Sequence, residues 1–573
     1  MAAPLTFGTL IGDMLQGGRE DEERREMPAS RPFSLLARMS RWRRRALAVA
    51  AGAASVLAMA PFFLWPVLFL TLPLLVFLID YAVTTAPRRA PAHAASITWL
   101  FAFGYFLAGL FWIGEAFLVE AEKFAVLMPF AVMAMPAGLA LFWAGAAAVA
   151  SLFWQPGRQR VVVLALTLAA AEWLRGHILT GFPWNVLGYA LTAPDALMQS
   201  AALLGIYGLT FVAVILFALP LVVWGDASRD GVRQPMRVAM FPACASLATL
   251  AALYAWGSFR LAIERPDDQP LRVRLVQPSI PQREKWRAEL QRRNFERHLD
   301  LTRRNTEGTI DDAKGIDLVV WPEAAMPFLV LDMPAALEAI GRVVPEGGHL
   351  VAGLIRVEPA PLRTARPRKI FNSLAAFGPD GQPIAVYDKT HLVPFGEYLP
   401  LQDTLEAIGL EQLTRIRGGF DIGPSPRPLL RVAGLPAFAP LICYEIIFPR
   451  TVIQSAERPA ALLNLTNDGW FGNTTGPRQH FHQTRGRAVE EGLPVIRSAN
   501  NGISAVIDAY GRVSARLDLD VAGAVDANLP GRLPPPVYAR FGDAIFWGLW
   551  LLTVVGLTIS MRRRRPGNYS IYQ

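Results

Sequence analysis

Three residues of different chemical type each stand at the end of an apolar run that is typical of a buried β-strand. They are Glu323, Lys389 and Cys443. Layered α/β folds place their functional side chains at the carboxyl ends of strands, so these three can meet. A thiol is a strong nucleophile once a base removes its proton, and the oxyanion formed by its attack needs positive charge. A carboxylate and a lysine that converge on one cysteine supply both.

Each of these residues also has a structural interpretation. A cysteine on an apolar strand is usually a core residue, a glutamate after Trp-Pro can cap a turn, and a lysine at a strand end is usually solvated. The three residues together are harder to explain by structural roles than each one alone. The other cysteine, Cys244, lies in a predicted membrane span and is interpreted as packing.

Cofactor and metal chemistry have little support in the sequence. His480 and His482 alternate, but the chain has only 7 histidines and no acidic cluster beside these two. We therefore expect no metal site. The predicted strands lack a Gly-x-Gly-x-x-Gly turn and a phosphate loop, so we expect no nucleotide and no other cofactor.

The elements that must position the three residues lie in residues 259–538, where short apolar runs alternate with helix-compatible stretches. This alternation favours an α/β layered sheet. The expected helices are 284–305, 333–343 and 479–491. The expected strands are 271–277, 317–321, 349–355, 384–387, 437–443, 461–465, 495–498 and 503–507.

The rest of the chain is apolar enough to cross a membrane. The sequence is 53% hydrophobic and 18% charged, which excludes a disordered regulator and a fully soluble enzyme. Residues 46–79 carry no Asp, Glu, Lys or Arg, and Pro61 and Pro66 divide them into two short helices. A span needs about 20 apolar residues. The six further candidates are 96–117, 124–152, 160–174, 199–224, 238–258 and 541–560.

The net charge of +9 is gathered in short clusters beside these spans. In an eight-span topology every cluster falls on one side, which the positive-inside bias makes cytoplasmic. Membrane topology explains this pattern better than nucleic-acid binding, so we expect no nucleic-acid partner. In an alternative reading, residues 41–60 are a signal peptide cleaved after Ala58-Met59-Ala60, but Pro61 follows directly and the apolar run continues to Ile79.

These patterns divide the chain into five parts. We expect a disordered cytoplasmic extension over 1–44 and a membrane domain with seven spans over 45–258. A periplasmic catalytic domain over 259–538, a last transmembrane helix over 539–561 and a basic cytoplasmic tail over 562–573 follow. The chain is thus expected to be a multi-pass protein of a bacterial inner membrane.

The motifs around the three residues resemble two related families. Trp321-Pro322-Glu323, Lys389 and Cys443-Tyr444-Glu445 resemble the Glu–Lys–Cys triad of the nitrilase superfamily of carbon–nitrogen hydrolases. The longer motifs, over roughly residues 45–560, resemble the apolipoprotein N-acyltransferase family. They are Asp388-Lys389 through Phe395-Gly396-Glu397, Asn467-Asp468-Gly469-Trp470-Phe471, Phe182-Pro183-Trp184-Asn185, and Arg497-Ser498-Ala499-Asn500-Asn501-Gly502.

The resemblance implies a fold and a set of roles. The fold is a polytopic α-helical membrane domain of about eight spans with an extramembrane α/β nitrilase-like α-β-β-α sandwich. Cys443 matches the nucleophile, Glu323 the general base and Lys389 the group that stabilises the oxyanion. Supporting active-site positions are Glu397, Tyr444 and Glu445. Possible substrate-binding positions are Trp286 on an arm over the site, Trp184 and Trp470.

The implied reaction is a ping-pong acyl transfer. A phospholipid acylates Cys443, and the thioester then passes its acyl chain to the N-terminal amine of S-diacylglyceryl-cysteine on an apolipoprotein. A membrane-anchored nitrilase-type amidase with the same triad is the alternative enzyme. The other class considered is a transporter or scaffold, which the scarcity of intramembrane charge disfavours. The enzyme is expected to act as a monomer.

Overall fold

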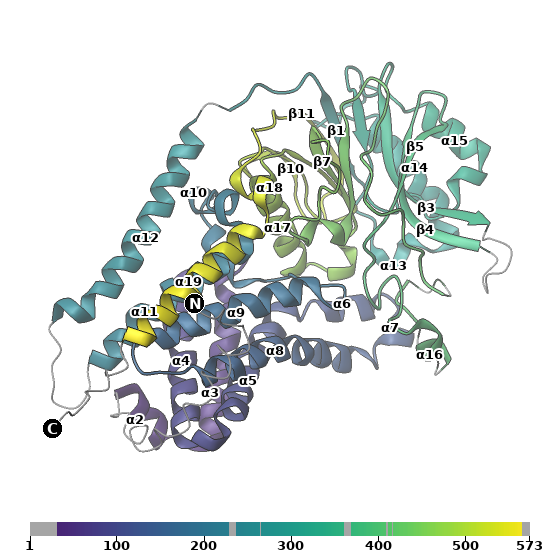
Figure 1. Cartoon of the computed structure of the whole chain (residues 1–573). Coiled ribbons are helices and arrows are strands. Elements are labelled where there is room, and N and C mark those ends of the chain that lie inside the picture. Colours follow the sequence, from purple (N-terminus) through teal and green to yellow (C-terminus); the bar gives the residue numbers. More distant parts are fainter. Residues whose placement is uncertain are drawn as a thin grey trace, which may run out of the picture.

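The computed structural model describes residues 31–563, apart from 228–235, 264, 360–367, 408, 410, 415 and 417. A strand-rich domain lies on one end of a bundle of helices, and α12 and α19 run alongside the bundle from that domain (Figure 1). The predicted disorder over residues 1–44 is wrong for most of 31–44, which forms α2 (Arg31–Arg38) and the start of α3 (Arg41–Ser55). The reason is packing, since Leu36 of α2 is buried in the core of the bundle. Residues 1–30 and most of the basic tail, 564–573, lie outside the described residues.

The bundle follows the apolar segments of the sequence. Pro61 and Pro66 lie in the break between α3 and the next long helix, as predicted. The further helices of this half are α4 (Leu68–Thr85), α5 (Ala90–Leu110), α6 (Ile113–Leu118), α7 (Ala121–Phe124), α8 (Met128–Leu152), α9 (Gln159–His177), α10 (Asp195–Met198), α11 (Ala201–Ala227), α12 (Met236–Ala262), α18 (Val537–Phe541) and α19 (Ala544–Arg563).

Among the described residues, six helices are long and apolar enough to cross a membrane. They span Trp65–Thr85, Pro87–Leu110, Met128–Leu152, Ala201–Asp226, Met240–Ala262 and Ala544–Met561. The two remaining predicted spans fall on α3, which has 15 residues, and on α9, which carries a buried Glu172–Arg175 ion pair near its C-terminal end. The fold therefore has the predicted helical membrane half, with about the predicted number of spans.

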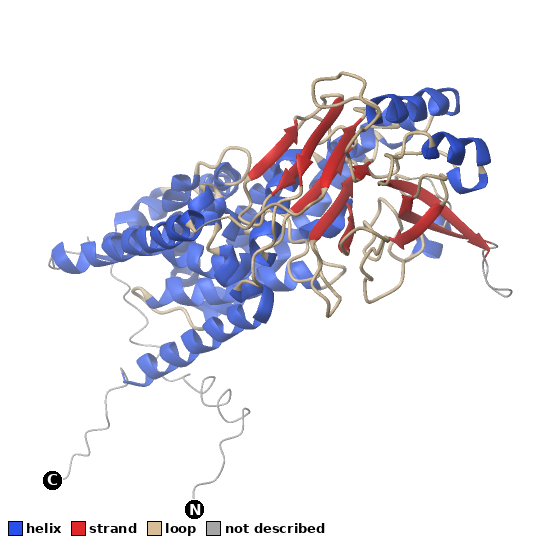
Figure 2. Ribbon diagram, turned by 90° about the horizontal axis from the view of Figure 1, so that it is seen from above, coloured by secondary structure: helices blue, strands red, loops and turns tan. Residues whose placement is uncertain are grey.

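The strand-rich domain contains two sheets (red in Figure 2). The first has the order β11-β1-β2-β3-β4-β5 and the second β10-β9-β8-β7-β6. Strands β1, β2 and β3 are parallel, as are β6, β7 and β8. The strands are β1 (Arg272–Gln277), β2 (Leu318–Val320), β3 (His349–Pro359), β4 (Arg368–Phe377), β5 (Pro383–Asp388), β6 (Phe438–Ile442), β7 (Ala461–Thr466), β8 (Val495–Ala499), β9 (Ser504–Ile507), β10 (Val513–Leu517) and β11 (Gly523–Asn528).

The sheets pack face to face, with helices outside them. Apolar side chains of both sheets share one core, which includes Leu275 of β1 and Leu463 of β7. Helices α14 (Gln291–Thr302) and α15 (Pro334–Gly341) cover the first sheet, and α17 (Gly476–Glu491) covers the second. The short helices α13 (Gln282–Lys285) and α16 (Gln402–Ala407) lie in loops. The result is the predicted α-β-β-α sandwich.

Eight strands lie where the sequence predicts them, and three were missed. Edge strand β10 is largely exposed, and edge strand β11 has the sequence Gly-Ala-Val-Asp-Ala-Asn, so neither carries a clear apolar pattern. Strand β4 is almost fully buried in its second half, but polar Asn372 and Ser373 interrupt its apolar run. As shown below, Asn372 lies in the candidate site.

Candidate active site

Cys443 is the first residue after β6 and begins the short 3-10 helix η8 (Cys443–Ile447). Its φ of 51° lies in the left-handed region, which is rare for a residue other than glycine. The side chain is buried, and burial raises the pKa of the thiol well above its usual value. Glu323 raises this pKa further, while Lys389 and a hydrogen bond with Thr466 lower it. The resting group is thus a neutral thiol that requires a base before it can attack.

Glu323 lies directly beyond β2, at the same end of the sandwich. Its carboxylate is buried and accepts a hydrogen bond from the Asn372 amide at 2.8 Å. Burial raises the pKa of Glu323, and Lys389 opposes this rise. A carboxylate with a raised pKa is suited to accept and return a proton near neutral pH.

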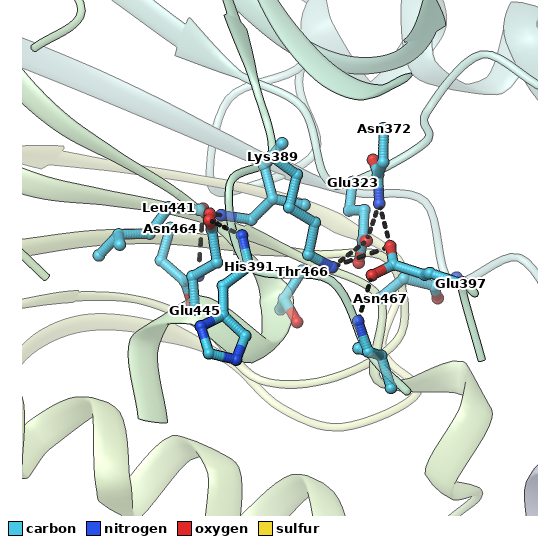
Figure 3. A network of polar contacts seen from close by, with 12 residues as sticks. Glu323, Asn372, Lys389, His391, Glu397, Leu441, Glu445, Asn464, Thr466 and Asn467 are labelled. Atoms are coloured by element: carbon cyan, nitrogen blue, oxygen red, sulfur yellow. Dashed lines mark hydrogen bonds and ion pairs between the residues drawn. The ribbon is translucent and has the colours of Figure 1, made fainter. Parts of the chain in front are cut away.

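Lys389 follows β5 and points toward two carboxylates (Figure 3). Its ammonium group lies 2.9 Å from Glu397 Oε1 and 3.8 Å from Glu323 Oε1. Burial alone lowers the pKa of Lys389, but Glu397 and then Glu323 outweigh this effect and raise it. The lysine is therefore a fixed positive charge, in position to stabilise an oxyanion.

Glu397 and Asn372 complete this polar group. The Asn372 side-chain nitrogen donates to Glu397 Oε1 at 2.7 Å as well as to Glu323, and the Val393 N–H donates to Glu397 Oε2 at 2.7 Å. Asn372 thus bridges two buried carboxylates that would otherwise repel each other. Sequence reasoning missed this residue, because its strand was not predicted and asparagine is not a typical member of such a triad.

Glu445 has a different place from the other supporting residues. Its buried carboxylate accepts hydrogen bonds from Ile442 N at 2.7 Å and from Thr390 N at 3.0 Å, and it pairs with Arg427 at 2.9 Å. Burial raises the pKa of Glu445, but Arg427 and the Ile442 N–H outweigh it and lower the pKa. The ionised carboxylate ties the end of β6, which carries the nucleophile, to the loop after Lys389. Glu445 therefore positions the other residues.

Tyr444 connects the nucleophile to the membrane half. Its hydroxyl donates to the carbonyl oxygen of Gly181 at 2.9 Å, and its ring stacks near Phe182. Both partners lie in the loop after α9. The residue next to Cys443 therefore rests directly on the helical half of the chain.

Comparison with known proteins identifies families that match both halves of the chain. Residues 51–219 match the apolipoprotein N-acyltransferase N-terminal domain, and residues 272–532 match the carbon-nitrogen hydrolase family. The chain is 44% identical over 528 residues to the apolipoprotein N-acyltransferase of Rhodopseudomonas palustris, covering 92% of this chain and 96% of the relative. It is 45% identical over 525 residues to that of Bradyrhizobium diazoefficiens, covering 91% and 95%.

The chain belongs to the apolipoprotein N-acyltransferase family. It is accordingly an acyltransferase with a nitrilase-like domain, and a membrane protein, rather than an amidase. Among solved structures it is similar to an amidase from Nesterenkonia sp., with 21% identity, a TM-score of 0.32, and coverage of 50% of this chain and 98% of the amidase.

The three tryptophans predicted to bind substrate lie in different surroundings. Trp184 is only 1% exposed and donates to Gln479 Oε1 of α17 at 2.8 Å. It packs between the two halves, and its role in substrate binding stays a prediction. Trp286 follows α13 and is 41% exposed, and Trp470 is half-buried in the short helix η9 (Asp468–Phe471). Both remain predicted substrate-binding positions.

The two histidines considered as metal ligands have protein partners instead. His480 bonds Asp468 at 2.8 Å, and His482 bonds the Thr192 hydroxyl at 2.8 Å. Within the described part of the chain, no three His, Cys, Asp or Glu residues are grouped so that they could hold a metal ion. A further residue that sequence reasoning missed, Lys285, donates to the backbone oxygen of Glu323 at 2.9 Å.

Proposed function

We propose that this enzyme transfers an acyl chain from a phospholipid to the N-terminal amine of S-diacylglyceryl-cysteine on an apolipoprotein, through a thioester on Cys443. The observation that carries the proposal is the buried group of Cys443, Glu323 and Lys389 at the end of the sandwich that rests on the helical half. A site placed there meets substrates whose acyl chains stay in the bilayer. Removing such chains from lipid costs about 0.8 kcal/mol per methylene, so the enzyme must bring its site to the membrane.

The first half-reaction forms the thioester. The Glu323 carboxylate takes the proton of the Cys443 thiol, and the sulfur attacks the sn-1 ester carbonyl of the phospholipid. The negative charge that develops on the carbonyl oxygen is stabilised by the Lys389 ammonium group. When the carbon–oxygen bond breaks, the departing alkoxide takes the proton from Glu323. A lyso-phospholipid leaves, and the acyl chain remains on the sulfur.

The second half-reaction uses the same groups in the reverse sense. The neutral α-amine of the diacylated cysteine attacks the thioester carbonyl, and Lys389 again stabilises the oxyanion. Glu323 takes a proton from the attacking nitrogen and returns it to the sulfur as the carbon–sulfur bond breaks. An amide forms and the thiol is restored. One pocket thus serves two lipid substrates in turn, which is the kinetic pattern of a ping-pong enzyme.

The carboxylate pair gives Glu397 a role in this scheme. Glu397 holds Lys389 at 2.9 Å and so fixes the position of the positive charge. We assign Glu397 the role of orienting Lys389, and Glu323 the role of transferring the proton. The hydrogen bond from Asn372 keeps the Glu323 carboxylate directed into the site.

The proposal includes a location. The enzyme is placed in the bacterial inner membrane as a monomer, with residues 259–538 on the periplasmic side. The clustering of arginines beside the predicted spans supports this orientation. Cysteine labelling with a membrane-impermeant reagent tests it in intact cells. A cysteine introduced at exposed Arg283 should react with the reagent from the periplasm. A cysteine there that the reagent does not label would place residues 259–538 on the cytoplasmic side instead.

The transfer itself is tested with two substrates. Purified enzyme in detergent is incubated with a phospholipid carrying a deuterated sn-1 chain and with a synthetic diacylated lipopeptide. We expect the deuterated chain on the peptide amine and an equal amount of lyso-phospholipid. Release of free fatty acid, with the lipopeptide unchanged, would mean that water is the acceptor and would contradict the proposal.

A further inference from the structure

Lys285 lies on an arm of the chain that crosses the active-site end of the sandwich. The arm, residues 278–290, connects β1 to α14 and contains α13. It is fixed at its start by Asn500, whose side chain donates to the Ile280 oxygen at 2.8 Å. A second bond joins Asn467 to Gln282 at 2.8 Å. These contacts bring the arm to the ends of the strands that carry the catalytic group.

The ammonium group of Lys285 is buried against the candidate base. The residue is 1% exposed, although the next residue, Trp286, is 41% exposed. Its nitrogen donates to the backbone oxygen of Glu323 at 2.9 Å. The partner is a backbone carbonyl group, so this contact is a hydrogen bond and not an ion pair. Burying a lysine in this way is costly, and such positions are commonly functional.

Three titratable groups face Lys285. Burial lowers the pKa of Lys285 to about 8, and Glu323 and Cys443 act against this change. The third group is His298 of α14, whose pKa burial lowers to about 3, so that it is neutral at physiological pH. Lys285 therefore carries positive charge over much of the neutral range, beside the two groups that exchange a proton.

We propose that Lys285 is a positioning residue, which docks the 278–290 arm on Glu323 and whose charge favours the ionised form of Cys443. This proposal deepens the proposed function and rests on it for the identity of the nucleophile and base. The bond to the Glu323 oxygen fixes the backbone from which the carboxylate projects. The same bond holds the part of the arm that carries Trp286. Movement of the arm when a substrate enters would then be coupled to the alignment of the base.

The test is the pH dependence of Cys443 alkylation by iodoacetamide, in a Cys244→Ser background that leaves one thiol. Lys285→Met removes the charge at similar length, Lys285→Arg retains it, and Arg283→Met removes an exposed charge from the same arm as the matched control. A loss of one favourable charge interaction corresponds to a shift of about one pKa unit, so we expect alkylation at pH 7 to fall about tenfold in Lys285→Met.

The shape of the curve of alkylation rate against pH distinguishes an effect of the Lys285 charge from a general loss of structure in the variant. In the wild type, the alkylation rate should rise less steeply above pH 8, because Lys285 loses its proton there. This change of slope should be absent in Lys285→Met. It should also be absent in Lys285→Arg, because guanidinium remains protonated. Hydrogen exchange of the arm should be faster in Lys285→Met only. If Lys285→Met does not fold, the wild-type and Lys285→Arg profiles still make the comparison.

Two results would overturn the proposal. One is a Lys285→Met profile that matches that of Arg283→Met. The other is a Lys285→Arg profile that keeps the wild-type change of slope above pH 8. Alkylation does not need a lipid substrate, so it remains informative if the wild type fails to take an acyl chain from phospholipid. That failure would contradict the proposed function and leave the effect of Lys285 on the thiol intact.

Discussion

Asn372 bridges the two buried carboxylates of the site, and its replacement tests how their charges are managed. In Asn372→Leu the side chain keeps a similar volume but loses the nitrogen that donates to Glu323 at 2.8 Å and to Glu397 at 2.7 Å. Both carboxylates then lose a donor, and their mutual repulsion is less opposed. The Lys389 ammonium group remains between them.

The size of the effect follows from the hydrogen bond to Glu323. A hydrogen bond to a charged group contributes about 1.5–3 kcal/mol. One pKa unit corresponds to roughly 1.4 kcal/mol, so the pKa of Glu323 should rise by about one to two units above its already raised value. Because the ionised form of Glu323 accepts the thiol proton, less of the enzyme is competent at pH 7. On the acid limb of the pH profile, below the pKa of Glu323, we expect thioester formation to slow about 10- to 100-fold.

The assay is single-turnover acylation of Cys443 by phospholipid, followed from pH 5 to pH 9. The acid limb of the profile should move to higher pH in Asn372→Leu, and the rate should recover in part as the pH rises. Ser373→Ala is the control, since Ser373 is the next residue of β4 and bonds Asp388 at 2.6 Å instead of the carboxylate pair. An unshifted acid limb in folded Asn372→Leu would refute the assigned role of the bridge.

Three further predictions concern the groups around the nucleophile. Arg427→Met leaves the buried carboxylate of Glu445 without its cation, so we expect a loss of about 3–5 kcal/mol in stability, measured by thermal unfolding in detergent; a change within error would contradict the ion pair. Arg427 and the Ile442 N–H lower the pKa of Glu445 in the folded protein. The contribution of Glu445 to the free energy of unfolding is therefore fully present above its pKa in the unfolded state, about 4.5, and is lost as the pH falls through its lower pKa in the folded state. Glu445→Gln should therefore remove part of the acid sensitivity of unfolding. A pH dependence of stability identical to that of the wild type would show that Glu445 is not a source of the acid sensitivity. Tyr444→Phe loses the bond to Gly181 at 2.9 Å, and we expect about 1 kcal/mol less stability with slower acylation from lipid; full activity in a lipid assay would show that this contact is dispensable.

The sequence was a good guide to the fold where its patterns were strong. The long apolar runs predicted the helices of the bundle, and the runs before Glu323, Lys389 and Cys443 predicted strands whose ends meet. The missed β10 and β11 are edge strands, and neither sequence shows a clear apolar pattern. The start of the bundle was also missed, because α2 is stabilised by packing and its own sequence is not strongly apolar.

The site was predicted in part for similar reasons. Glu323, Lys389 and Glu397 are brought together as the motifs implied. Asn372 and Lys285 were not anticipated, because their importance comes from hydrogen bonds made across the fold to Glu323. Trp184 shows the opposite case, in which a motif residue proved to be buried between the two halves. Local sequence contains little information on which distant group a polar side chain will meet.

The most direct test of the central claim is the intact mass of the purified enzyme after incubation with phospholipid alone. We predict a gain of one acyl group that hydroxylamine removes, that is absent in Cys443→Ala, and that a diacylated lipopeptide discharges. A folded wild-type enzyme that binds phospholipid and yet shows no added mass would contradict the thioester mechanism.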